Sequence, residues 1–224
     1  MFIVRVWVPD RPGALGAVAS RIGAVGGDLV GIDILEQGGG LAIDELVVEL
    51  PDENLISLLI SEVSEVDGVD VEELRPVIGE LPDARLDALE TAAVLVEQHD
   101  VDALMDALAA RACKDFEAEW ASVVDLDASL SLASTGATPP AAWLAAFVHG
   151  SRMSDRASAG EFGPDEVAWA PLKAADLALV LGRRARPFRA RERRQLAALA
   201  RIADTRWMEL ISQAGRLRHP AQLQ

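Results

Sequence analysis

Two hydrophobic periodicities alternate along the first part of the chain, and their order restricts the fold more than any other feature. From Phe2 to Val8 the residues alternate between two faces, as in a strand. The segment Asp10-Arg11-Pro12-Gly13 interrupts this pattern, and from Leu15 to Val25 the apolar residues recur at helical spacing. We interpret Asp10 as the helix N-cap, Pro12 as a first-turn residue and Gly26-Gly27 as the helix stop.

The residues that follow predict three further strands and one helix. Strands from about Asp28 to Glu36 and from Leu41 to Leu50 flank Gly38-Gly39-Gly40, which is typical of a hairpin. A second helix opens at Pro51-Asp52-Glu53, and a strand from Val69 to Leu74 follows. The order β-α-β-β-α-β is the ferredoxin-like arrangement, in which two helices cover one face of a four-stranded antiparallel sheet. The edge strands of such a sheet have unpaired backbone groups, so an edge strand can pair with the same strand of a second copy.

The remainder predicts a second α+β domain. Residues 77–85 lie in a segment with two prolines and a glycine and are interpreted as a linker, residues 86–216 as the second domain and residues 217–224 as a tail. We expect a central antiparallel sheet bracketed by the first and last helices of this domain. Its expected elements are a leading helix from Leu86 to Ala112, strands Glu119 to Asp125 and Ser129 to Ser134, a helix Ala141 to Gly150, a polar loop Ser151 to Pro164, a hairpin of Glu166 to Leu172 with Ala175 to Arg183, and a closing helix Arg189 to Arg216.

The first 76 residues resemble an ACT domain. The resemblance rests on the order of the elements and on VPDRPGALGAVASRIGAVGGDLVGIDIL at residues 8–35, where a strand enters a D-R-P-G turn, a helix follows, and Gly-Gly-Asp comes at the expected distance. It implies a regulatory module that binds an amino acid, usually between two copies of the domain. It also implies a site in which Asp10 and Asp28 replace the Asn residues of serine-binding members, with Asp28 reaching from the partner chain.

The residues themselves support a site at the D-R-P-G turn. A helix start offers free N–H groups and positive partial charge to a carboxylate, and Gly13 allows close approach to the backbone. Asp10 could neutralise an ammonium group, and two aspartates favour an amine over a ligand that needs a side-chain donor. In the alternative interpretation these residues bind no ligand: Asp10 only caps the helix, and Asp28 only begins a strand. The predicted ligand-binding residues are Asp10, Arg11, Pro12, Gly13, Ala14, Leu15, Gly26, Gly27, Asp28 and Leu29.

Residues 86–212 resemble a GAF domain. The strand pair EWASVVDLD and SLSLAST, the hairpin EVAWAPLKAADLALVLGR and the closing helix RARERRQLAALARIADTRW carry this resemblance. It implies a sensory module that binds a small ligand or dimerises. Trp120, Trp143 and Trp169 fall on elements that would surround its pocket, although indoles in a core are commoner. Cys113, which directly follows the last apolar residue of the helical pattern, is interpreted as a structural thiol at the end of the leading helix.

Charge and composition narrow the function classes. The net charge of −15 disfavours a nucleic-acid binder, although residues 183–218 carry 11 Arg against 3 acidic residues. That basic run is either a docking surface for an unidentified protein partner or a solvated helix face. The single cysteine, with no signal peptide or membrane span in the sequence, predicts a cytoplasmic protein. His99, His149 and His219 lack metal-ligand spacing, so we expect no metal and no cofactor.

These observations predict a non-enzymatic regulatory protein. The leading hypothesis is a homodimer that binds an amino acid at its ACT interface and carries a GAF-like signalling module. The alternative is a constitutive dimerisation or interaction scaffold without a small-molecule ligand. A third hypothesis is an enzyme that uses Asp10 and Asp28 as an acid–base pair.

Overall fold

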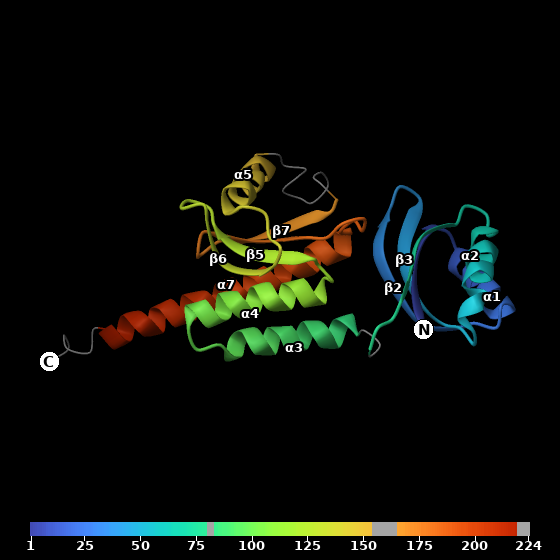
Figure 1. Ribbon diagram of the computed structural model, residues 1–224, viewed down its shortest axis with the longest axis horizontal. Helices are drawn as coiled ribbons and strands as arrows, with labels where there is room; N and C mark the ends of the chain where they lie inside the picture. Colours follow the sequence, from blue (N-terminus) through green and yellow to red (C-terminus); the bar gives the residue numbers. More distant parts are fainter. Residues whose placement is uncertain (80–82, 154–164, 219–224) are drawn as a thin grey trace. The chain divides into compact units, whose positions relative to one another are not determined.

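A computed structural model describes residues 1–79, 83–153 and 165–218 and divides the chain into two compact units, residues 1–82 and 83–224. Each unit contains a four-stranded antiparallel sheet with helices packed against it (Figure 1). Most of the polar loop expected at Ser151 to Pro164 lies outside the described residues, as do residues 219–224 of the expected tail.

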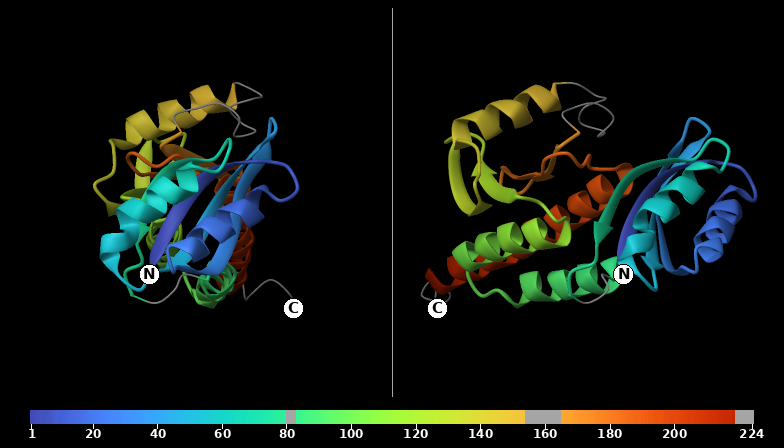
Figure 2. Two further views of the ribbon diagram at one scale, coloured as in Figure 1. Left: turned by 90° about the vertical axis from the view of Figure 1, so that its right-hand side faces the viewer. Right: turned by 45° about the vertical axis from the view of Figure 1, so that its right-hand side comes forward.

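The first unit follows the predicted β-α-β-β-α-β order. Its sheet has the strand order β2-β3-β1-β4, so β2 and β4 are the edge strands. The helices α1 and α2 lie side by side on one face of that sheet (Figure 2). Its elements are β1 (Phe2–Pro9), α1 (Ala14–Ala24), β2 (Asp28–Gly38), β3 (Leu41–Glu49), the 3-10 turn η1 (Glu53–Leu55), α2 (Ile56–Ser64) and β4 (Asp70–Pro76).

The alternation in β1 builds the core of the first unit. Val4, Val6 and Val8 are buried on the face that the helices cover. From α1 and α2 the buried side chains Val18, Ile22, Leu59 and Val63 pack onto them in one apolar cluster, together with Leu46 and Val48 of β3. Removal of these side chains from water is the main driving force for this arrangement.

The start of α1 differs from the prediction. The helix begins at Ala14, and its N-cap is Gly13 with φ 87° and no side-chain cap, so the assignment of Asp10 as N-cap is wrong. Pro12 also lies before the helix instead of in its first turn. The Asp10 N–H donates to the Gly40 carbonyl at 2.9 Å, which fixes Asp10 to the β2–β3 hairpin, three residues before the N-cap.

The end of α1 agrees with the prediction. Gly26, with φ +79°, donates its N–H to the Gly23 carbonyl, and Gly27 donates to the Ile22 carbonyl, both at 3.0 Å. This pair of bonds is the Schellman motif, which favours glycine at the left-handed position. At Gly39 and Gly40 both φ angles are positive, as a two-residue type I′ hairpin requires, so the predicted hairpin is confirmed.

The second unit has the strand order β6-β5-β8-β7. Asp83 and Asp100 cap its first two helices by accepting hydrogen bonds from backbone N–H groups of the first turns. Its elements are α3 (Ala84–Glu97), α4 (Val101–Asp115), β5 (Trp120–Asp125), β6 (Leu130–Gly136), α5 (Ala141–Arg152), β7 (Val167–Leu172), β8 (Leu177–Gly182) and α7 (Ala190–Arg218).

Both faces of this sheet are covered, and β8 is buried along its whole length. Leu177, Leu179 and Leu181 share a cluster with α4 and α7, whereas Ala178 and Val180 share another with α5. Figure 1 shows α5 on the opposite side of the sheet from α4 and α7. The expected bracketing by the first and last helices is therefore wrong, since α3 packs against α4 and α7. The single leading helix that the sequence predicted is two helices, α3 and α4, because Asp100 caps the start of α4. Cys113 lies in α4.

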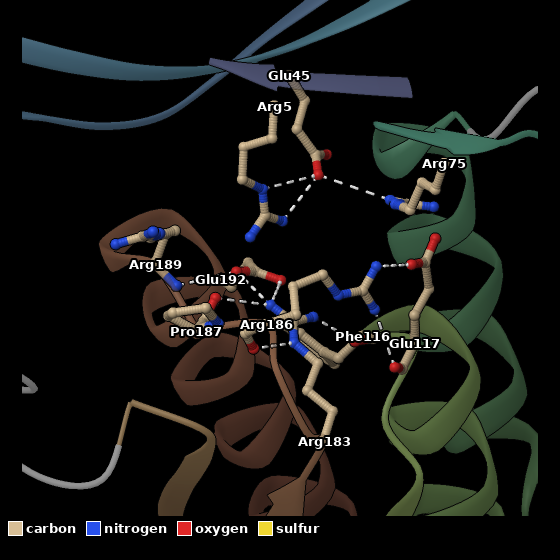
Figure 3. A network of polar contacts seen from close by, with 10 residues as sticks. All are labelled: Arg5, Glu45, Arg75, Phe116, Glu117, Arg183, Arg186, Pro187, Arg189 and Glu192. Atoms are coloured by element: carbon tan, nitrogen blue, oxygen red, sulfur yellow. Dashed lines mark hydrogen bonds and ion pairs between the residues drawn. The ribbon is translucent and has the colours of Figure 1, made fainter. Parts of the chain in front are cut away.

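The basic run near the carboxyl end is used in part for internal contacts. Arg183 is buried and donates to the carbonyls of Phe116, Arg186 and Pro187 and to the Glu192 carboxylate (Figure 3). Figure 3 also shows, within the first unit, Arg5 and Arg75 both directed at Glu45. Arg183 is therefore a structural cation, and only part of the run is available as an exposed face.

We predict that Asp100→Ala destabilises the second unit by about 1 kcal/mol, because its carboxylate accepts the Ala103 N–H at 2.8 Å at the start of α4. Chemical denaturation followed by tryptophan fluorescence measures the effect. Asp106→Ala removes the same charge from an exposed position inside the helix and should change the free energy of unfolding by less than about 0.5 kcal/mol. Equal effects of the two variants would contradict the capping role.

Candidate functional site

The turn between β1 and α1 presents unused backbone donors. The N–H groups of Gly13, Leu15 and Gly16 donate to no other residue among those that the structure describes. Gly13 and Gly16 are exposed, and a Cβ at either position would have no neighbour within 4 Å. The amides lie at the positive end of the helix, and those of Gly13 and Gly16 are sterically open, so they can donate hydrogen bonds to a carboxylate.

The other residues predicted at this turn have different roles. Asp10 is exposed and lies beside the β2–β3 hairpin through its bond to Gly40. Arg11 makes an exposed ion pair with Asp67 at 3.6 Å, and Pro12 has no N–H to offer. Ala14 is buried, and its N–H donates to the Arg11 carbonyl at 3.3 Å. Among the predicted ligand-binding residues of this turn, Gly13 and Leu15 therefore keep their N–H groups available, and Gly16 is an addition to the prediction.

The predicted residues at the end of α1 lie elsewhere in the same unit. Gly26 and Gly27 use their N–H groups in the helix cap, and a Cβ on Gly27 would come within 3.0 Å of Ile22 Cγ2. Leu29 packs onto the core of the unit. These three residues therefore shape the backbone that leads into β2.

Asp28 and Asp10 lie at opposite ends of the sheet within one chain. Pro9, which precedes Asp10, pairs with Leu41, whereas Asp28 pairs with Glu49 at the other end of β3. Eight residue steps along β3 separate these two pairings, and at a strand rise of about 3.3 Å per residue they span roughly 26 Å. The two carboxylates of one chain therefore do not form a single site.

A third carboxylate, absent from the predicted site, lies closer to the turn. Asp44 of β3 is only 3% exposed, and its Oδ1 atom has no hydrogen-bond partner. Burial, with a further contribution from the neighbouring Asp10 carboxylate, raises the pKa of Asp44 above its ordinary value. The sequence did carry a signal, because strand alternation places Asp44 on the same face as Ala42, Leu46 and Val48.

The second unit offers weaker candidates for a site. Trp120 packs against Gly182, Trp143 stacks on Phe147 with ring centroids 5.7 Å apart, and Arg152 lies over the Trp169 ring. The Cys113 thiol donates to the Ala118 carbonyl, and burial raises its pKa, as is typical of a structural thiol. A groove of about 250 Å³ is lined by Val96, Arg201, Ile202, Thr205, Arg206 and Glu209.

Other kinds of site find no support in the described residues. Nowhere in residues 1–79, 83–153 and 165–218 do three or more His, Cys, Asp or Glu side chains group in a way that could hold a metal ion. Over the same part of the chain, the model contains no helix with the length and apolarity that crossing a membrane requires.

Comparison with known proteins identifies the class of the first unit. The β-α-β-β-α-β order, with a D-R-P-G turn between the first strand and the first helix, is the pattern on which the sequence resemblance rested. Residues 2–68 match the family model of the ACT domain, so the first unit contains an ACT domain. No family match extends over the second unit, and the GAF resemblance stays a prediction. No curated protein matches the chain.

Proposed function

We propose that the protein is a non-enzymatic regulator that binds a free amino acid at an ACT-domain dimer interface. ACT domains are commonly regulatory and ligand-binding, which supports a regulatory role for this chain. The observation that carries the proposal is the set of free N–H groups at Gly13, Leu15 and Gly16, beside the Asp10 carboxylate. Donors for an α-carboxylate and an acceptor for an α-ammonium group lie on one turn.

The position of Asp28 supports a site shared by two copies. Strand β2 is a sheet edge, and its side chains Val30, Ile32 and Ile34 are exposed. Antiparallel pairing of two β2 strands brings the Asp28 end of one copy to the Gly38 end of the other. The Gly38 end adjoins Asp10, because Asp10 bonds to Gly40. In this arrangement the Asp28 of a second copy completes the site that its own chain cannot reach.

The predicted GAF-like module remains part of the proposal for the second unit. Its antiparallel sheet, covered by helices on both faces, supports this assignment. On α7, Arg194 and Arg201 are exposed and offer a basic face to an acidic protein partner. We propose a cytoplasmic location, in keeping with a single half-buried thiol.

A screen of the common amino acids tests the function directly. We expect one or a few of them to raise the melting temperature and to shift sedimentation velocity profiles towards dimer, because a ligand stabilises the state that binds it by about 2.7 kcal/mol at 100 times Kd. Asp28→Ala should abolish both effects while leaving the ligand-free melting temperature unchanged, since Asp28 is exposed at the start of β2.

The matched control is Asp70→Ala, which removes an exposed acid from β4 at the other sheet edge and should leave both ligand effects intact. If no amino acid changes either measurement while the protein is dimeric, the ligand-free scaffold is the correct function. If Asp10→Ala lowers a turnover rate instead of a ligand affinity, the protein is an enzyme.

A further inference from the structure

We propose that Asp44 binds the ammonium group of the ligand and thereby restricts the site to amino acids, excluding the matching hydroxy acids. This inference rests on the proposed function and names a residue that determines its specificity. It is carried by a buried carboxylate oxygen without a partner on β3, two rows from the end of the sheet where the turn with the free N–H donors begins.

The strand register places Asp44 near the end of the sheet from which the chain turns into α1. Its register partners are Val6 on β1 and Ile34 on β2, and Val6 belongs to the face that the helices cover. The next pair on the same face, Val8 with Ala42, lies two residues further along the strands, towards the end of the sheet where the turn to α1 begins. Asp44 is therefore in the next row inwards, and the carboxylate of Asp10 is near enough to disfavour its ionisation.

The arginines of the first unit, which contains no lysine, are engaged with other acids. Arg21 pairs with Glu62 and Glu65, and Arg11 pairs with Asp67. Arg5 and Arg75 pair with Glu45, which points away from the helices because it alternates with Asp44 along β3. An ionised buried carboxylate without a cation is costly, and this cost favours an external cation at Asp44.

The chemistry of the surroundings selects the kind of cation. The free N–H groups of Gly13, Leu15 and Gly16 attract an anionic group, whereas Asp10 and Asp44 attract a cationic one. A ligand that carries both groups on one carbon atom, as an α-amino acid does, satisfies donors and acceptors together. A hydroxy acid can donate an O–H hydrogen bond but carries no positive charge, so it leaves the buried negative charge of Asp44 uncompensated, which is costly.

The side of Asp44 that faces the β2 edge is less covered than the side that faces β1. Its neighbour Ile34 on β2 is 45% exposed, although Val6 on the other side is fully buried. The ammonium group would enter from the β2 side, which is also the edge that a second copy covers in the proposed dimer. The same contact would then hold the ligand between Asp44 of one chain and Asp28 of its partner.

Isothermal titration calorimetry of the full chain tests this role with three matched pairs of probes: serine and glycerate, valine and 2-hydroxyisovalerate, and phenylalanine and phenyllactate. We expect at least one amino acid to bind and its hydroxy acid to bind at least tenfold more weakly. Asp44→Asn should weaken the amino acid by tenfold or more and leave the hydroxy acid within threefold of the wild type, so that the selectivity is lost. Asp70→Asn removes one exposed negative charge and should preserve the selectivity.

The outcomes separate the two proposals. If the amino acid binds and Asp44→Asn keeps the wild-type affinity and selectivity, the role of Asp44 is refuted while the proposed function stands. If no probe and no other common amino acid binds to the wild type, the proposed function fails and the role of Asp44 fails with it. Asp44→Ala should reproduce the loss, and circular dichroism of each variant confirms that the strands of the first unit are intact.

Discussion

Gly136→Ala is expected to destabilise the second unit by about 2 to 5 kcal/mol. Gly136 ends β6 with φ +77°, a conformation that a side chain disfavours. A Cβ built there would lie 2.1 Å from the Glu119 carbonyl oxygen, which is a backbone atom of the neighbouring chain segment. Because backbone atoms cannot rotate away, β6 must separate from β5 to accommodate the methyl group.

Urea unfolding followed by tryptophan fluorescence measures this effect, because Trp120, Trp143, Trp169 and Trp207 lie in the second unit. Gly150→Ala is the matched control, since Gly150 lies in α5 and a Cβ there meets nothing within 4 Å. We expect the control to stabilise the unit by up to about 1 kcal/mol, owing to the higher helix propensity of alanine. A Gly136→Ala variant as stable as the wild type would show that β6 ends differently.

Asp44→Asn is expected to stabilise the ligand-free protein at neutral pH by about 1 to 3 kcal/mol, because it removes a buried charge that has no partner. The gain depends on pH. Above the raised pKa of Asp44 in the folded state, the folded protein carries the full penalty of the ionised group. As the pH falls through that pKa, the folded protein takes up a proton, and the stability of the wild type rises relative to the variant.

Below the ordinary value of 3.8 the carboxyl is protonated in both folded and unfolded chains, so the advantage of the variant disappears. Differential scanning calorimetry at a series of pH values measures the difference. Asp70→Asn, at an exposed position, should follow the wild type throughout. A stabilisation by Asp44→Asn that stays constant down to the most acid pH would show that charge burial is not its cause.

The local sequence predicted most of the first unit because its signals agree with each other. Alternation in β1, helical spacing in α1 and the glycines of the cap and hairpin all specify the same backbone, and the ACT match covers these elements. The start of α1 was mispredicted because the Asp10 N–H bonds to Gly40, a residue thirty positions away. Such a contact between distant segments leaves no local trace in the Asp-Arg-Pro-Gly motif.

The candidate site was predictable only in part for the same reason. The turn from Asp10 to Leu15 could be identified from a motif, but the unsatisfied Asp44 depends on which strands and helices surround it. In the second unit, the break between α3 and α4 rests on the short segment Gln98-His99-Asp100, whose cap signal competes with continuous apolar spacing on both sides. The sequence also did not predict which helices cover which face of the second sheet, because that arrangement depends on tertiary packing and not on a local pattern.

The separation of Asp10 and Asp28 along β3 has a consequence for how such a regulator would respond in a cell. If two chains must meet before either proposed binding site is complete, ligand occupancy depends on protein abundance as well as on effector concentration. At low expression the half-saturating effector concentration would be high, and it would fall as the protein accumulates. The placement of Asp10 and Asp28 at opposite ends of β3 would thereby make the sensitivity to the effector depend on the number of protein copies in the cell.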